Sequence, residues 1–172
     1  SQSRCLIMEF RPLSNSIVEE FLRTQGQVPD YLAKASAAFA QGNLGKAMRY
    51  AKSEDFIETK DMILNLLRHV QDMTVSDMLE NIKELGTRKD EVRDYIDLME
   101  LWYRDVLIFK ATKNINQLIF QDESTNIAKE ASLRGYEQIE HIMQAFEKAK
   151  VRLKANVNFE VTMELMLMAL KD

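Results

Sequence analysis

One arginine near the amino terminus has the chemistry of a phosphate-binding residue. Arg4 lies between Ser3 and Cys5, immediately before residues 6–10, where apolar side chains recur at every second position and predict a strand that Pro12 ends. The planar guanidinium group of an arginine can stabilise the charge on a phosphoryl group during its transfer in a neighbouring molecule. The tripeptide alone fits a solvated arginine equally well, so the rest of the chain must decide between the two.

The other patterns that carry chemistry are incomplete. A phosphate-binding loop built on Gly45 and Lys46 would need a glycine at position 40 and a serine or threonine at position 47, and both positions hold alanine. His69 and His141 are far apart, and neither has the Glu-x-x-His or His-Glu-x-x-His spacing of a metal-binding helix. The sequence therefore predicts no catalytic site of its own, no cofactor and no metal.

The remaining conspicuous side chains have structural interpretations. Trp102 lies in the middle of an apolar stripe and is predicted to anchor a core. The methionines of residues 163–168 could form an adaptable binding face, but core filling is the simpler interpretation. Solvated charge is the default for the carboxylates that share expected helix faces with basic neighbours, namely Glu80, Glu84, Asp97 and Glu100.

Composition limits the class of protein. The 172 residues are 46% hydrophobic and include only five glycines and two prolines, so a packed helical fold is expected. The net charge of −4 argues against a nucleic-acid-binding surface over the whole fold, although a local basic patch is compatible with it. Cys5 is the single cysteine, which fits a reducing, cytoplasmic location, and no apolar run has the length of a membrane span. Ser1 and the strand without a partner suggest the back part of a longer protein.

Helical spacing predicts two groups of helices after residue 12. Residues 12–52 contain three short, alanine-rich helices, with Ser14 or Ser16 as the first cap and Pro29 at the start of the second helix. From residue 53 the helices are longer and their apolar side chains larger, so we place a domain boundary near residue 53.

Residues 53–172 are predicted to form a packed bundle of about five helices. The strongest stripe includes Trp102, Val106 and Phe109, and a second long amphipathic helix contributes Phe146, so these four residues are the predicted core of this part. Residues 114–120 are expected to form a loop or a single turn, followed by a weak helix. The last helix, residues 159–170, is apolar on more than one side and is expected to be enclosed by neighbours.

The stretch Ala38–Ser53 also has the small residues and Gly-Asn turn of a tetratricopeptide repeat. An array of such repeats needs the pattern again after about 34 residues. That shift places Gly42 on Ser76, where the small residues are missing, and the reverse shift reaches Met8 in the predicted strand. The repeat hypothesis is therefore rejected.

Four stretches taken in order carry a family resemblance. They are Ser3-Arg4-Cys5 with the strand after it, Gly42–Met48, Leu101–Leu107 and Asn156–Leu170, and together they resemble the delta-prime subunits of bacterial DNA polymerase III clamp loaders, of the Firmicutes type. The resemblance runs over essentially the whole chain and begins partway through the AAA+ module of such subunits.

The resemblance implies an all-α fold with a division of labour. Residues 1–11 would be a strand remnant of the AAA+ core with the SRC motif, residues 12–52 a three-helix lid, and residues 53–172 a helical collar that holds the subunit in a five-membered ring. The partners would be the gamma or tau and delta subunits, with the sliding clamp and primer-template DNA reached only through the assembly and no membrane involved. Arg4 would be an arginine finger that completes the ATP site of a neighbouring subunit in trans, and the chain would be an accessory subunit of the DNA polymerase III holoenzyme, a DNA-directed DNA polymerase.

The lid of the family also bears on nucleotide sensing. ATP-binding relatives have Gly-Ser-Leu-Arg-Asp-Ala-Leu, and the aligned run here places Gly42 at the first position and Gly45 where the sensing arginine would be. Lys46 is adjacent but points about 100° away around a helix, so we do not count it as a replacement. The resemblance thus implies a degenerate sensor in a subunit that does not hydrolyse ATP.

A second class of function stays open. A generic helical adaptor that binds one partner helix in a groove, with no link to replication, would have the same composition and periodicity. DNA binding by the collar itself is disfavoured, because the chain is acidic and has no face on which aromatic and basic residues alternate.

Overall fold

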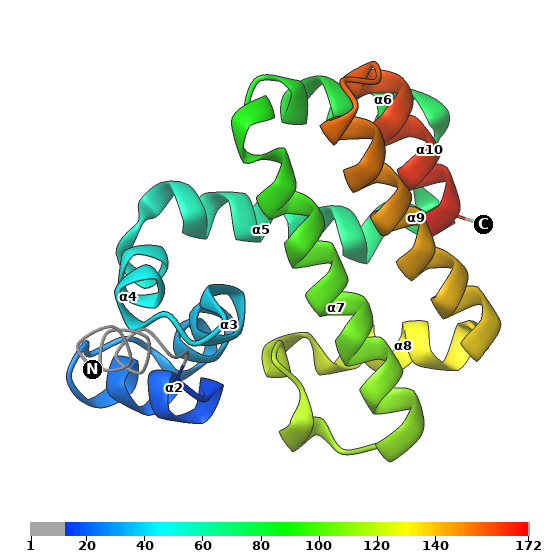
Figure 1. Cartoon of the computed structure of the whole chain (residues 1–172). Helices are drawn as coiled ribbons and strands as arrows, with labels where there is room; N and C mark the ends of the chain where they lie inside the picture. The colour runs from blue at the N-terminus through cyan, green and yellow to red at the C-terminus, as the bar shows by residue number, and fades with distance from the viewer. Residues whose placement is uncertain (1–12, 172) are drawn as a thin grey trace, which may run out of the picture. The chain divides into compact units, whose positions relative to one another are not determined.

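The structure, a computed structural model, describes residues 13–171. Within that range it contains nine α-helices, α2 to α10, with short 3-10 turns between them and no strand (Figure 1). The predicted all-α class is therefore confirmed. The predicted strand and the SRC motif, Ser3, Arg4 and Cys5, lie outside the described residues.

The chain divides into two compact units. The first ends at Ile57 and the second begins at Glu58, so the division falls inside helix α5 (Glu54–His69). The sequence predicts the change near residue 53, which is the C-cap of α4 and lies directly before α5. Each unit has its own apolar interior and is described by itself.

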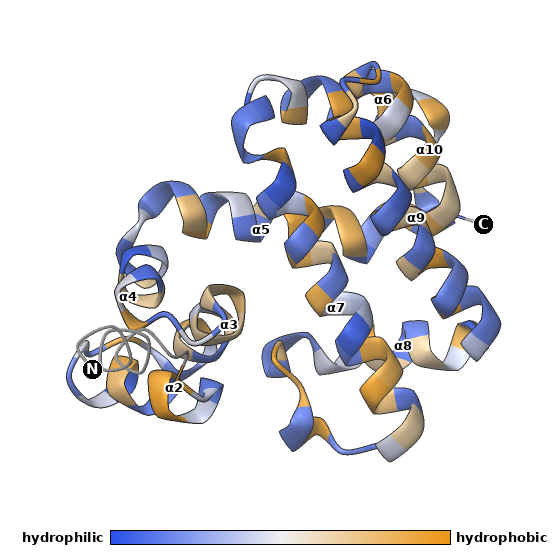
Figure 2. Cartoon of the chain, in the orientation of Figure 1, coloured by the Kyte–Doolittle hydropathy of each residue, from blue (hydrophilic) through white to orange (hydrophobic). Residues whose placement is uncertain are grey.

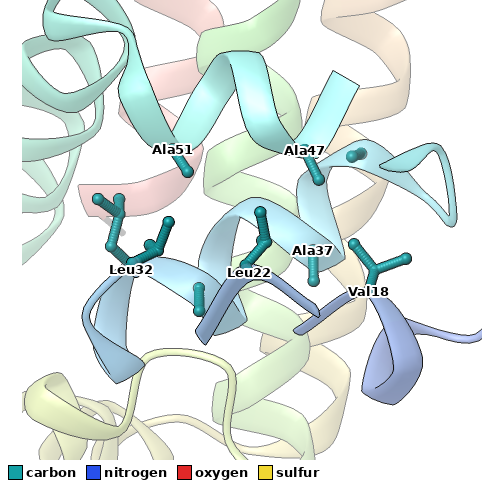
Figure 3. Packing of buried hydrophobic residues seen from close by; sticks show 9 residues of the cluster. Val18, Leu22, Leu32, Ala37, Ala47 and Ala51 are labelled. Atoms are coloured by element: carbon teal, nitrogen blue, oxygen red, sulfur yellow. The ribbon is translucent and has the colours of Figure 1, made fainter. Parts of the chain in front are cut away.

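The first unit contains α2 (Asn15–Thr24), α3 (Asp30–Ala40) and α4 (Leu44–Lys52), and its core is built largely from alanine. Figure 3 shows the small side chains of the three helices directed toward one another. Because an alanine side chain is a single methyl group, the helices can pack closely, and a few larger residues fill the remaining space. The buried cluster is Val18, Leu22, Val28, Leu32, Ala33, Ala37, Ala40, Ala47 and Ala51.

The helices of this unit have well-defined ends. The side chain of Ser14 accepts a hydrogen bond from the backbone N–H of Ile17 and caps α2. Asn43 caps α4 by accepting from the N–H of Lys46 at 2.9 Å. Gly42 has φ 86°, a left-handed conformation that glycine adopts at no steric cost, and this allows the tight turn between α3 and α4.

The second unit contains the rest of α5 and α6 (Val75–Gly86), α7 (Val92–Thr112), α8 (Ser124–Leu133), α9 (Tyr136–Lys154) and α10 (Phe159–Lys171). α10 packs against α9 and α6, while α7 packs against α8 and α9. Along these helices, hydrophobic positions alternate with hydrophilic ones in Figure 2, as expected for helices with one buried face. Thr74 and Asp77 form a reciprocal capping box at the start of α6.

The four predicted core residues do not share one environment. Trp102, Val106 and Phe146 are fully buried. Phe109 is only partly buried, because it lies in the last turn of α7, where the ammonium group of Lys113 covers its ring at 5.6 Å. The core of this unit is therefore centred on the middle of α7.

The segment between α7 and α8 is more ordered than a plain loop. A 3-10 turn at Ile115–Gln117 is followed by three buried apolar residues, 118–120. The carboxylate of Asp105, itself fully buried, accepts hydrogen bonds from the backbone N–H groups of Ile119 and Phe120 at 2.9 and 2.8 Å. The helix expected to be weak after this segment is the regular ten-residue α8.

The last helix, α10, differs from its prediction. Met163 and Met166 are buried as core-filling residues. However, Val161, Leu165 and Met168 are exposed, and their i, i+4, i+7 spacing places them on one side of the helix. One face of α10 is thus apolar and uncovered, which corrects the expectation that neighbours enclose the whole helix.

Candidate functional site

The residues predicted to form a degenerate sensor lie at and just before the start of α4. Gly45 is exposed in the first turn, and a Cβ added there would meet only Oδ1 of Asn43, at 3.7 Å. The packing therefore leaves room for a larger side chain at this position. Lys46 is held elsewhere, with its Nζ 5.6 Å from the centroid of the Tyr50 ring one turn further along α4.

Tyr50 in turn belongs to an aromatic cluster of the first unit. Its ring packs edge-on against Phe39 at 4.6 Å and tilted against Phe56 at 4.7 Å, while Phe39 and Phe56 are 5.1 Å apart. The amine of Lys46 thus lies beside a structural aromatic cluster. This placement gives Lys46 a packing role.

A pocket of about 280 Å³ in the second unit is lined by side chains of α5, α7, α8 and α9. One wall is formed by Arg68, whose Nε and guanidinium NH2 donate to the carboxylate of Glu123 in a bidentate pair. Burial alone would raise the pKa of Glu123, but the hydrogen bonds from Arg68 and Asn126 outweigh it and lower that pKa. The charges of Arg68 and Glu123 are therefore already paired with each other.

Another part of the pocket lining belongs to a buried network around Glu130. The carboxylate of Glu130 accepts from Nε of Arg134 at 2.7 Å and from the Tyr103 hydroxyl at 3.2 Å. Arg134 also donates to the carbonyl oxygen of Leu170, and Gln71 donates to the same oxygen at 3.1 Å. Burial is the main reason that the pKa of Tyr103 is raised, so the hydroxyl stays protonated and able to donate. The network ties α7, α8 and the 3-10 turn Val70–Asp72 to the end of α10.

A third polar cluster surrounds Lys150 on α9. Its ammonium group lies 3.2 Å from Asp97 and 3.8 Å from Glu147, and it also contacts Glu100. Burial raises the pKa of Glu100 despite the adjacent lysine. For Lys150, burial would lower the pKa, but the hydrogen bonds to Glu100 and Asp97 outweigh it and raise that pKa. Three carboxylates around one ammonium group form a structural ion cluster.

These clusters do not form a catalytic constellation. Within residues 13–171, no group of three His, Cys, Asp or Glu side chains is placed to hold a metal ion, and His69 and His141 are both exposed. In the same part of the chain, none of the helices has both the length and the apolar composition to cross a membrane. The ionisable groups of the three clusters form ion pairs and hydrogen bonds that hold helices together.

The sequence did not predict these clusters, and Asp97 and Glu100, which were expected to be solvated charges, instead pair with Lys150. The Glu130–Arg134 pair and the Glu147–Lys150 pair have the i, i+4 and i, i+3 spacings of helix ion pairs, so a systematic search for such spacings would have found them. Arg68 and Glu123 are 55 positions apart. Nothing in the sequence links those two residues, and only the packing of α5 near α8 brings them together.

The surface of the described residues has two exposed apolar stripes on helices. One is the α10 face of Val161, Leu165 and Met168. The other lies in the first unit, where Leu13, Ile17 and Phe21 are exposed at i, i+4, i+8 spacing along and just before α2. Stripes of this kind are typical of surfaces that contact other protein segments.

The chain resembles a replication protein over nearly its whole length. It is 26% identical over 182 residues to "DNA polymerase III subunit delta'" of Bacillus subtilis (strain 168), covering 99% of this chain and 52% of that protein. The matched region is the carboxyl-terminal part of the relative. The resemblance to delta-prime subunits, first inferred from the four short stretches, is confirmed by this comparison.

The other two comparisons are negative. No protein-family model matches the chain. No solved structure matches it. The chain spans about half the length of the curated relative, so the activity and partners of a whole delta-prime subunit are not established for it by this similarity.

Proposed function

We propose that this chain is the carboxyl-terminal part of a clamp-loader delta-prime subunit, acting in the cytoplasm during DNA replication. The observation that carries the proposal is the similarity to the Bacillus subtilis subunit along 99% of the chain. A local motif shared by chance would not extend over two compact units. The role is one of assembly, in which the chain holds a place in a ring of unlike subunits.

The two units suggest how the proposed role is divided. The second unit, with its large core and three internal ion clusters, would serve as the collar that joins gamma or tau and delta subunits. The first unit, with α2, α3 and α4, would serve as the lid of the AAA+ module. In this proposal the sliding clamp and the primer-template DNA are bound only by the whole assembly.

The sensor position supports a subunit that does not use ATP itself. Gly45 has no side chain to reach a nucleotide, and a Cβ there would make only an ordinary contact with Oδ1 of Asn43. The lack of an arginine is therefore not imposed by crowding in this unit. A subunit that hydrolysed ATP would need the charge, and its absence favours delta-prime over gamma or tau.

Arg4 carries the one chemical role in the proposal. As part of Ser3-Arg4-Cys5, it would place its guanidinium group at the ATP site of the adjacent gamma or tau subunit and stabilise charge on the transferring phosphoryl group. The support for this assignment is the motif together with the similarity to a delta-prime subunit. The chain would then raise the turnover of a reaction that another subunit performs.

Two measurements test the proposal. The full-length protein, mixed with the gamma or tau and delta subunits of the same organism, should co-elute with them from a sizing column. In the assembled loader, Arg4→Ala should lower DNA-stimulated ATP turnover by at least about tenfold, because an arginine finger contributes about 10³–10⁵-fold to turnover at the site that it completes. Arg49→Ala, which changes an exposed arginine on α4, is the matched control and should leave turnover unchanged.

The second candidate function is a helical adaptor with no link to replication. The exposed α10 face of Val161, Leu165 and Met168 favours it, since a partner helix could cover such a stripe. The mixing experiment separates the two candidates. An adaptor of this kind would not co-elute with clamp-loader subunits, and that result would remove the replication proposal.

A further inference from the structure

A small pocket lies between the start of α7 and the end of α9, within the second unit. Its volume is about 170 Å³, and Val92, Ile96 and Leu153 form its apolar lining. The other three lining residues are cationic, namely Arg93, Lys150 and Lys154. We call this feature the α7–α9 pocket.

The positive charges of the α7–α9 pocket are not all balanced. Lys150 is turned to Asp97, Glu100 and Glu147 and is neutralised by them. Arg93 and Lys154 are exposed, and their side chains form no ion pair or hydrogen bond with another residue in the described part of the chain. The pocket therefore has an apolar floor with two free cations at its edge.

Helix electrostatics explain only one of these two cations. Lys154 is the last residue of α9, where a positive side chain interacts favourably with the negative end of the helix dipole. Arg93 is the second residue of α7, close to the positive end of that helix, where a cation is unfavourable. Stability of α7 alone therefore gives no reason for an arginine at this position.

The surface next to the pocket is also apolar. Val151 lies one turn before Lys154 on α9, on the same side, and is 67% exposed. Pockets that bind whole cofactors or drug-sized molecules measure about 300 Å³ or more, so a volume of about 170 Å³ suits a single large side chain. An arginine at the edge can also stack on an aromatic ring seated in the floor.

We propose that the α7–α9 pocket binds a segment of another protein in which one large apolar side chain is flanked by carboxylates. The apolar side chain enters the floor formed by Val92, Ile96 and Leu153. The flanking carboxylates pair with Arg93 and Lys154. The choice of occupant follows from charge complementarity, and it does not depend on the clamp-loader proposal.

The direct test uses peptides of defined chemistry and the ¹⁵N-labelled protein. An acetylated and amidated Glu-Glu-Phe-Glu-Glu peptide should shift the backbone amide signals of residues 92–97 and 150–155, with a dissociation constant near or below about 1 mM. Peptides with lysine in place of each glutamate, or alanine in place of the phenylalanine, should bind at least about tenfold more weakly. Added salt should weaken binding of the acidic peptide, because the paired charges are exposed.

Two variants of the protein test whether the acidic peptide binds in the α7–α9 pocket. Val92→Asp puts a carboxylate in the floor, and an acidic residue in the first turn of α7 is compatible with the helix dipole. Arg93→Glu combined with Lys154→Glu reverses the edge charges at exposed positions. Lys83→Glu combined with Lys129→Glu makes the same change in net charge at exposed sites on α6 and α8 and is the matched control.

Both pocket variants should lose at least about tenfold in affinity for the acidic peptide, while the control should stay within about twofold. The proposal is wrong if the acidic peptide shifts no signals at the pocket, or if the lysine peptide binds as well. It is also wrong if the control variant loses as much affinity as the edge variant. Should Val92→Asp unfold, the edge variant decides alone. Self-association of the chain that is abolished by the edge variant would identify a second copy as the occupant and overturn the proposal.

Discussion

The two units solve the problem of packing helices in different ways. The first unit packs three short helices with mostly small side chains, and Figure 3 labels alanines and leucines of this core beside Val18. The second unit uses large aromatic residues, above all Trp102, Tyr95 and Tyr103 of α7, and adds buried ion pairs. The first unit therefore depends on close backbone approach, whereas the second depends on filling volume and on satisfying buried charge.

The largest expected effect removes volume from the second unit. Trp102→Ala empties the centre of its core, where the side chain is fully buried against neighbours that include Phe120, and should cost about 3–5 kcal/mol of unfolding free energy. Hydrogen exchange followed residue by residue should show lost protection in α7, α8 and α9 with α2, α3 and α4 retained. Equal loss of protection in both units would contradict the independence of the two cores.

Trp102→Phe is the matched variant for this prediction. It keeps an aromatic ring and leaves a smaller cavity, so its cost should fall clearly below that of the alanine variant. Thermal unfolding followed by far-ultraviolet circular dichroism measures both variants, because Trp102 is the single tryptophan and its fluorescence is lost in each.

The next effect concerns buried charge, which the first unit lacks among its described residues. Glu130→Ala leaves Arg134, which is 4% exposed, without its carboxylate and should cost about 3 kcal/mol, as expected when one member of a buried pair is removed. Glu140→Ala changes an exposed glutamate on α9 and should cost less than about 0.5 kcal/mol. Denaturant unfolding measures both, and similar costs would show that the network adds nothing to stability.

The third effect tests close approach in the first unit. A Cβ at Gly26 would lie 2.8 Å from the backbone oxygen of Leu22 and 3.1 Å from the sulfur of Met48. The backbone contact cannot be relieved by a rotamer change, so Gly26→Ala should destabilise this unit by about 1–3 kcal/mol. Gly45→Ala is the matched control, because its Cβ would make only an ordinary contact with Oδ1 of Asn43, at 3.7 Å, and it should be neutral or stabilising by up to about 1 kcal/mol.

Thermal unfolding and hydrogen exchange in α2 and α4 measure this pair of variants. A Gly26→Ala protein as stable as the parent would mean that the turn after α2 and the side chain of Met48 can shift at little cost. The first unit would then not depend on close backbone approach at this position.

The features that the sequence predicts are those set by residues close together in the chain. The helix caps were predictable, because Ser14, Asn43 and Thr74 act on neighbours three residues away. The burial of Trp102 followed from its place in a periodic stripe. Local patterns of this kind are sufficient for the helices and for the centre of each core.

Contacts between distant segments were beyond such reasoning. Asp105 orders the segment before α8 by accepting hydrogen bonds from two backbone N–H groups 14 and 15 residues away. No local sequence pattern indicates that role. The exposure of Val161, Leu165 and Met168 was missed because apolar composition does not say which face a neighbour covers. The proposed function likewise came from resemblance rather than from a pattern of residues, and Arg4 lies outside the described part of the chain.

The smallest effect that we expect is a pH dependence of stability, caused by two carboxylates of the second unit, Glu123 and Glu100. The pKa of Glu123 in the folded protein is below its ordinary value of 4.5, because hydrogen bonds from Arg68 and Asn126 outweigh burial. Its contribution to stability is therefore fully present above pH 4.5 and is lost as the pH falls through the lowered pKa. The pKa of Glu100 is raised by burial, so its charged form costs stability above the raised pKa, and that cost is relieved as the pH falls toward 4.5.

The two carboxylates thus affect stability in different pH ranges and with opposite signs. Glu123→Gln should flatten the loss of stability below pH 4.5, and Glu100→Gln should change the profile only above it, as measured by denaturant unfolding between about pH 3 and pH 7, the range in which carboxylates titrate. Identical profiles for the two variants would mean that neither ion cluster is maintained in solution as the structure describes it.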